Sequence, residues 1–114
     1  MTPEDARLKL EEFRVQVDDV DRRIVTLLNE RTSVVENIGR VKRQAQLPIY
    51  EPKREDQVFA NITESNRGPM SPEAVRRIFE RIIDEMRTIQ RLRMMDGTAA
   101  AAHPAESRNP EGDR

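Results

Sequence analysis

Arg31 and Lys42 are the residues whose types and spacing most directly suggest chemistry. The segment from Leu10 to Lys42 carries apolar residues in a 3-4 alternation, which predicts one long helix with a single apolar seam. Arg31 takes a seam position where an aliphatic residue is expected, so its guanidinium must pair with an anion or reach water. Lys42 follows 11 residues later, about 20° around the helix and about 16 Å along its axis. Both cations therefore face the same way, toward either an acid of a neighbouring helix or a bound anion.

Arg14 is a third cation beside the seam. It precedes Arg31 by 17 residues, which puts it about 100° away on the same helix, so the two side chains diverge within one chain. In an antiparallel or intertwined dimer, Arg14 of one chain could meet Arg31 and Lys42 of the other. The alternative is a solvated arginine that flanks Phe13.

Polar residues further along the chain could complete a site. Glu51, Arg54 and Glu55 share one helical face by i, i+3 and i, i+4 spacing, and they form either a polar wall or a surface ladder of ion pairs. Gln90 lies one turn past Met86 within an apolar stripe. It is therefore either a buried hydrogen bond between helices or a neutral donor aimed into a pocket.

The remaining residues offer no nucleophile constellation. The sequence has no Cys, its single histidine is His103, and neither a glycine-rich phosphate loop nor a metal-ligand cluster can be assembled. We therefore expect no cofactor and no metal. Chemistry would have to come from electrostatics and positioning.

The composition favours a small helical protein that oligomerises. Hydrophobic and charged residues each make up 36% of the 114 residues, so a lone globule would bury little apolar surface for its entropy cost. The net charge of −1 gives no global reason to expect nucleic acid. No apolar run is long enough to span a bilayer, and no signal-peptide core follows Met1. We expect a cytoplasmic protein that binds neither nucleic acid nor membrane.

The first predicted helix is unusually long. Thr2 and Pro3 form a cap followed by a proline, and the helix should run to about Arg43. About 40 residues at about 1.5 Å each give a rod of about 60 Å. Such a rod cannot bury its seam against the rest of the chain, so we expect a two-fold homodimer. The seam residues are Leu10, Phe13, Val17, Val20, Ile24, Leu27, Val34, Ile38 and Val41.

Two more helices are predicted after two proline signals. Pro52 should start a helix over about 51–66, and Ser71 followed by proline should open a third helix that ends near Gly97. The predicted fold is therefore all-α, with three helices per chain.

The residues from Gly97 onward are expected to form a disordered tail. They include no large apolar side chain that could dock on the helices. His103 lies in this tail, where no rigid frame supports catalysis. The predicted organisation is one helical domain, residues 1–96, followed by a tail, residues 97–114.

The order and spacing of these residues resemble the all-helical chorismate mutases, the AroQ class. The resemblance covers about residues 5–95 and is carried by Val20 to Arg31, by Lys42 after 11 residues, and by the Arg54-Glu55 pair after a proline loop. It implies an intertwined homodimer with two equivalent sites, each completed by an arginine from the partner's long helix. It also implies an isomerase that rearranges chorismate to prephenate, a pericyclic step in phenylalanine and tyrosine biosynthesis.

The resemblance implies a role for each cation and for the glutamine. Arg14 of the partner chain and Arg31 would each grip a substrate carboxylate. Lys42 would contact a carboxylate and the ether oxygen, and Gln90 would donate to the same ether oxygen. Glu55 would accept a hydrogen bond from the substrate hydroxyl.

Other positions either support this wall or depart from the family pattern. Arg54 would support the wall formed by Glu55. Glu51 stands where many members have Asp, and Met86 stands where some have a small polar residue. Both positions would touch the periphery of the substrate.

Two other functions stay open at this stage. An isochorismate pyruvate lyase of the same fold would use a similar set of cations. A non-catalytic helical dimerisation or regulatory module would leave Arg31 and Lys42 merely paired with acids. The resemblance also implies a possible complex with another shikimate-pathway enzyme.

Overall fold

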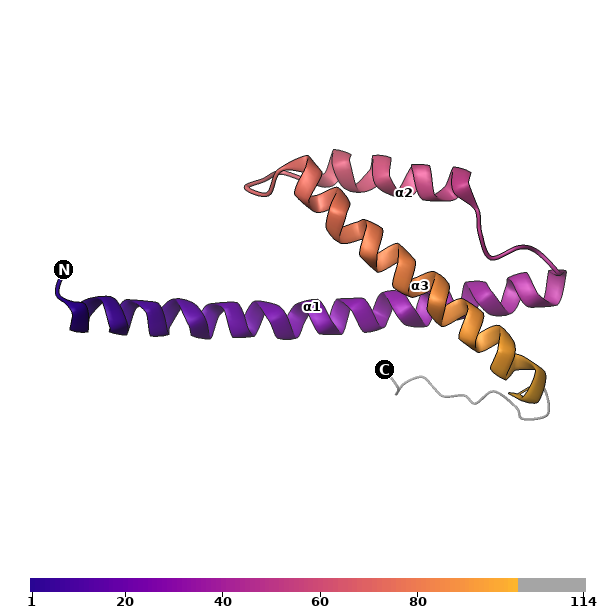
Figure 1. Ribbon diagram of the computed structural model, residues 1–114, viewed down its shortest axis with the longest axis horizontal. Coiled ribbons are helices and arrows are strands. Elements are labelled where there is room, and N and C mark those ends of the chain that lie inside the picture. The colour runs from indigo at the N-terminus through magenta and orange to yellow at the C-terminus, as the bar shows by residue number, and fades with distance from the viewer. Residues whose placement is uncertain (101–114) are drawn as a thin grey trace.

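The described part of the chain, residues 1–100 of the computed structural model, folds into three α-helices (Figure 1). α1 spans Pro3–Ala45, α2 spans Pro52–Ser65 and α3 spans Pro72–Ala100, and side chains are described through residue 93. No strand occurs within this range. The predicted all-α fold with one very long N-terminal helix is confirmed.

α1 begins where the sequence predicts, because Thr2 caps it. Thr2 Oγ1 accepts a hydrogen bond from the Asp5 backbone N–H at 3.0 Å, and the Asp5 carboxylate accepts one from the Thr2 N–H at 3.4 Å. Pro3 occupies the first helical turn, where a missing N–H costs nothing. The reciprocal capping box therefore fixes the start of the helix.

α1 ends at Ala45, two residues past the expected end. Gln46 closes the helix in the left-handed conformation, with φ of 58°, a position that glycine usually takes. Its N–H donates to the Arg43 carbonyl at 3.2 Å, and the Leu47 N–H donates to the Lys42 carbonyl at 2.7 Å. This turn begins the connector, residues 46–51.

The two shorter helices start at their predicted prolines. α3 is capped by Ser71, whose Oγ accepts a hydrogen bond from the Ala74 N–H at 3.1 Å. The predicted end of α3 near Gly97 was wrong, because the helix continues to Ala100. One glycine costs a helix only about 1 kcal/mol, and the alanines that follow Gly97 favour the helical state. The rest of the expected tail, with His103, lies outside the described residues.

α3 packs against both α1 and α2 (Figure 1). The apolar core at the crossing with α1 is small and consists of Val35, Ile83 and Met86. An ion pair between Arg93 Nε and Glu36 Oε2, 2.9 Å apart, also links α3 to α1. The helix pair is therefore held together over a short segment near the C-terminal end of α1.

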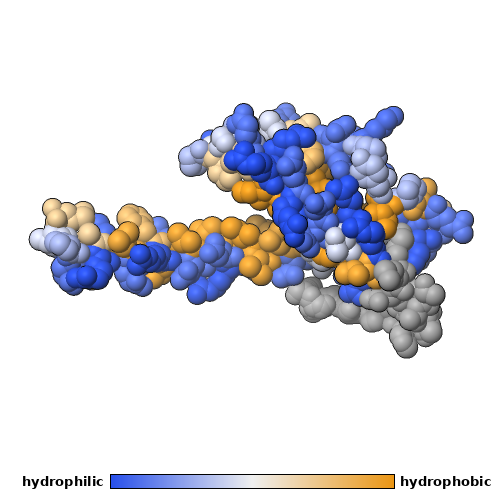
Figure 2. All heavy atoms as spheres, viewed as in Figure 1, coloured by the Kyte–Doolittle hydropathy of each residue, from blue (hydrophilic) through white to orange (hydrophobic). Residues whose placement is uncertain are grey.

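Among the described residues, no other helix packs on the first half of α1. Every residue from 7 to 27, here called the α1 arm, is exposed, and the molecule extends 63 Å along its longest axis. Figure 1 shows the arm projecting past the other helices, and Figure 2 shows an apolar band along it. Phe13 and Leu27 are 57% and 61% exposed. A continuous apolar surface of this kind marks an interaction site.

A search of the described helices finds none that is both long enough and apolar enough to cross a lipid bilayer.

Candidate active site

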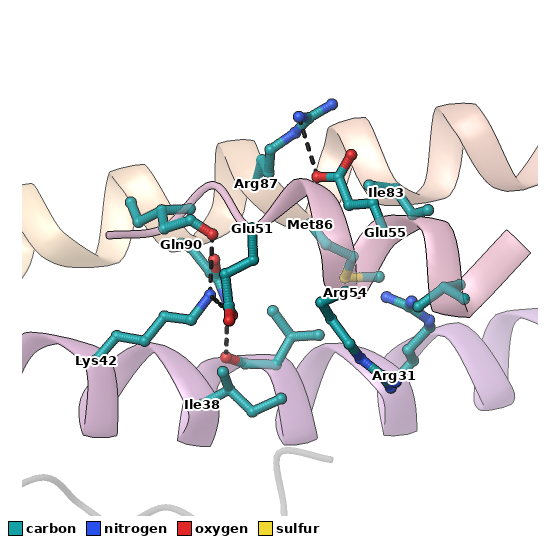
Figure 3. Close-up of a pocket in the computed structure, with 13 residues that line it drawn as sticks. Arg31, Ile38, Lys42, Glu51, Arg54, Glu55, Ile83, Met86, Arg87 and Gln90 are labelled. Atoms are coloured by element: carbon teal, nitrogen blue, oxygen red, sulfur yellow. Dashed lines mark hydrogen bonds and ion pairs between the residues drawn. The ribbon is translucent and has the colours of Figure 1, made fainter. Parts of the chain in front are cut away.

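A cavity of about 250 Å³ lies among the three helices and the connector (Figure 3). α1 supplies four of its residues, the connector two, α2 three and α3 four. This volume is close to the lower end of the range for small-ligand pockets, about 300 Å³. The lining residues are Arg31, Val35, Ile38, Lys42, Ile49, Glu51, Arg54, Glu55, Val58, Ile83, Met86, Arg87 and Gln90. All the predicted site residues except Arg14 line this one cavity.

Lys42 is a buried cation at one end of the cavity. It is only 8% exposed, and its Nζ donates to the Ile49 carbonyl at 2.9 Å and lies 2.8 Å from Glu51 Oε1. Glu51 is the N-cap residue of α2 but makes no side-chain cap bond there, because its carboxylate turns to Lys42. The hydrogen bond from Lys42 and its charge hold the pKa of the Glu51 carboxyl below its ordinary value. A buried lysine is thus neutralised by a half-exposed acid.

Arg31 and Arg54 lie close together on the other side of the cavity (Figure 3). Within the described residues, neither forms an ion pair with a carboxylate. Burial lowers the pKa of the Arg31 guanidinium, and repulsion by Arg54 lowers it further. An arginine keeps its charge near neutral pH all the same, since its ordinary pKa lies far above neutrality. Two uncompensated guanidiniums side by side favour a bound anion.

Gln90 fits both interpretations of its spacing, a buried hydrogen bond between helices and a neutral donor that faces a pocket. It is 7% exposed and lines the cavity. Its Nε2 also donates to the Val35 carbonyl of α1, at a long 3.4 Å. Gly39 lies beneath it, where an added Cβ would come within 3.6 Å of Gln90 Cγ. The amide is therefore held between α1 and α3 by a weak hydrogen bond that leaves donor capacity for a ligand.

Met86 and Val58 contribute apolar walls. Met86 is 7% exposed, and Thr32 Oγ1 lies 3.7 Å from its sulfur. The position predicted to touch the substrate periphery is thus an apolar surface packed against α1. Aliphatic walls of this kind exclude water and strengthen the electrostatic interactions inside a site.

Glu55 pairs with a residue that the sequence analysis missed. Its Oε2 lies 3.1 Å from Nη1 of Arg87, and the two side chains are 22% and 27% exposed. A spacing signal was available, because Arg87 precedes Gln90 by three residues and such pairs share a helical face. Glu51, Arg54 and Glu55 therefore do not form the surface ladder that was the alternative.

Arg14 is not brought to the cavity by its own chain. It lies in the α1 arm and is exposed. At a spacing of 17 residues, Arg14 and Arg31 are about 26 Å apart along the helix axis. A site that uses both arginines therefore needs a second chain.

The cavity carries an excess of positive charge. Its lining includes four cations and two carboxylates, an excess of two positive charges. The carboxylates of Glu51 and Glu55 are each engaged by a cation. Among residues 1–100, no group of three His, Cys, Asp or Glu side chains is placed to hold a metal ion. The arrangement can bind a small dianion and stabilise negative charge between Lys42 and Gln90.

Comparisons with known proteins identify the family to which this fold belongs. Residues 13–91 match the family model "Chorismate mutase type II". A chorismate mutase structure (form II) from Thermus thermophilus superposes with a TM-score of 0.71 at 36% identity, covering 73% of this chain and 94% of that one.

Curated relatives give the same family. A chorismate mutase of Methanocaldococcus jannaschii is 29% identical over 84 residues, which are 73% of this chain and 85% of the relative. A bifunctional chorismate mutase/prephenate dehydratase of Aquifex aeolicus is 34% identical over 87 residues, and there the match covers only 24% of the relative. The chain thus spans about a quarter of that bifunctional protein. Since the family model covers most of α1 and the whole of the cavity, the chain belongs to the chorismate mutase type II family.

Proposed function

We propose that this protein is an isomerase that rearranges chorismate to prephenate, in phenylalanine and tyrosine biosynthesis. The observation that carries the proposal is the cavity with two uncompensated guanidiniums, Arg31 and Arg54, beside the buried Lys42 and Gln90. Chorismate is a dianion, which matches the two excess positive charges of the cavity lining. The family membership and the Thermus thermophilus structure support the same reaction.

Binding would select the reactive conformer of the substrate. Arg31 of one chain and Arg14 of the other would hold the two carboxylates through bidentate, charge-assisted hydrogen bonds. Fixing both ends brings the enolpyruvyl side chain over the ring, so the entropy of orientation is lost on binding rather than in the chemical step. Arg54 and Glu55 would form the wall that faces the substrate hydroxyl.

Lys42 and Gln90 would lower the barrier itself. As the C–O bond of the ether breaks and the new C–C bond forms, negative charge grows on the ether oxygen. A lysine ammonium and an amide N–H that are already oriented in a site with little water stabilise this charge by several kcal/mol. Glu51 would have to yield part of its contact with Lys42 to the substrate, which its half-exposed position allows.

A homodimer would complete the site. The α1 arm exposes an apolar seam that a second copy of α1 can cover, and it carries Arg14 away from its own cavity. An intertwined pair would bury both seams and bring each Arg14 to the opposite cavity.

Turnover of chorismate by the purified chain is the direct test. We expect the chorismate absorbance to fall with formation of prephenate, and no pyruvate to be released. Pyruvate release from isochorismate without turnover of chorismate would instead identify the lyase of the same fold. Neither activity, with chorismate failing to bind, would contradict the proposal and favour a non-catalytic helical module, for which the Lys42 to Glu51 pair is the supporting observation.

We further propose a cytoplasmic location and association with another enzyme of the shikimate pathway. The fused prephenate dehydratase of the Aquifex aeolicus relative supports the second point.

A further inference from the structure

Arg87 is a cavity residue to which the proposed reaction gives no task. Its Nη1 lies 3.1 Å from Glu55 Oε2 of α2, and its Nη2 lies 2.8 Å from Asp84 Oδ1 of its own helix. Its Cζ lies 5.4 Å from the centre of the Tyr50 ring in the connector. Three groups from three elements thus hold the guanidinium in one orientation.

The Arg87 to Glu55 pair differs from a surface ion pair in its exposure. Its side chains are 27% and 22% exposed. The similar pair of Arg81 and Glu85 on the same helix is 74% and 49% exposed. Exposed pairs contribute little because water and salt screen them, and partly buried pairs are screened less. Arg87 is therefore placed to influence Glu55 substantially.

Figure 3 shows the Glu55 carboxylate turned toward Arg87 on the wall of the cavity. Without a cation beside it, this carboxylate would repel a dianionic ligand and could rotate toward Arg54 or Arg31, which line the same cavity. Either change would reduce the positive charge available to the ligand. The cation beside Glu55 thus keeps the other cations free.

We propose that Arg87 is a positioning residue that neutralises Glu55 and fixes its carboxylate, so that the site keeps its affinity for a dianion. This inference rests on the proposed function. Arg87 acts through Glu55 and does not touch the substrate. Because the contact between Glu55 and the substrate is present in both the ground state and the transition state, the effect appears in KM rather than in kcat.

The test is a double-mutant cycle on the whole 114-residue chain with chorismate as substrate. Arg87→Met should raise KM about tenfold, because the Glu55 carboxylate left without its cation repels the dianion, with kcat changed less than about twofold. Arg87→Lys should recover most of the lost affinity. In a Glu55→Gln background the same Arg87→Met change should alter KM by less than about twofold, because a neutral amide needs no cation.

Arg81→Met is the matched control, since it removes an arginine from the exposed pair on the same helix. It should leave KM and kcat unchanged. If Arg87→Met alone does not fold, the comparison of Glu55→Gln with the double variant, which leaves no unpaired charge, still carries the test.

Two results would overturn the inference while leaving the proposed function intact. One is an unchanged KM in Arg87→Met, and the other is an equally large rise of KM in the Glu55→Gln background, as expected if Arg87 binds substrate or only supports helix packing. A wild-type protein that neither binds nor turns over chorismate would overturn both the inference and the proposed function.

Discussion

The two halves of α1 share one seam but have different surroundings. In the α1 arm, residues 7–27, every residue is exposed, whereas Val35, Gly39 and Lys42 in the second half are buried by α3 and the connector. The apolar repeat runs through both halves, broken at Arg31, and its second-half members Val34, Ile38 and Val41 are also exposed, at 56%, 43% and 59%. Periodicity therefore predicted an apolar face along α1, but the face that α3 and the connector cover lies beside it and depends on tertiary contacts.

The difference between the halves also separates two kinds of cation. Arg14 in the arm is solvated in the single chain, while Lys42 in the second half is 8% exposed and held by two acceptors. Under the proposed function, the second half supplies the prebuilt part of the site and the arm supplies a residue to the other chain. Substitutions in the two halves should therefore fail in different ways.

The largest expected effect comes from Lys42→Ala in the buried half. It should lower kcat by about a hundredfold to a thousandfold, as loss of one preorganised donor does, and should change binding of substrate less. Steady-state kinetics with chorismate measure both quantities, and circular dichroism checks that the variant is folded. Wild-type turnover in this variant would remove Lys42 from the mechanism.

A charge placed on the seam of the arm should act on assembly. Leu27→Asp would bury a carboxylate in the proposed dimer contact at a cost of several kcal/mol, so we expect a monomer with little activity. Light scattering coupled to size exclusion measures the mass. Asn29→Asp, two residues further on the opposite face of the helix, is the control and should stay dimeric. A wild-type protein that is monomeric at assay concentration would contradict the dimer.

Mixing a variant of the arm with a variant of the second half tests whether each site uses residues of both chains. Arg14→Ala and Arg31→Ala should each be nearly inactive alone, and random exchange of subunits should restore about a quarter of the wild-type activity, because half the dimers then hold one intact site out of two. Native mass spectrometry verifies the exchange. Absence of recovery after verified exchange would mean that one chain provides both arginines.

The smallest expected effect concerns the Lys42 to Glu51 pair. Because the pKa of Glu51 is lowered in the folded state, its stabilising contribution is fully present above its unfolded pKa of about 4.3 and is lost as pH falls through the lower folded value. Melting temperatures of the wild type and Glu51→Gln should differ slightly at pH 6, and the difference should shrink as the pH falls below the unfolded pKa. A difference that does not change with pH down to acid unfolding would show that the pair's charge is not its cause.

The starts of the helices were predictable from the sequence because their signals are local. Thr2 with Asp5, and Ser71 with Ala74, make the cap contacts that their positions suggest. The end of α3 was not predictable from Gly97, since one weak helix former does not stop a helix whose neighbours favour it.

The members of the site were largely predictable, but their pairing was not. Helical spacing placed Arg31 and Lys42 on one face, and both line the cavity. The spacing could not show that Glu51 would turn away from its cap to reach Lys42, or that Arg87 would meet Glu55. These contacts join residues on different elements, so they depend on how α3 crosses the other helices and not on any single period.

One consequence follows from the length of the α1 arm. Helices that pack on nothing are only marginally stable in water, and none of the described residues outside α1 packs on the arm. Under the proposed dimer the second chain stabilises the arm, which should fray as the protein is diluted. For such a chain, melting behaviour and helical content become functions of protein concentration rather than fixed properties.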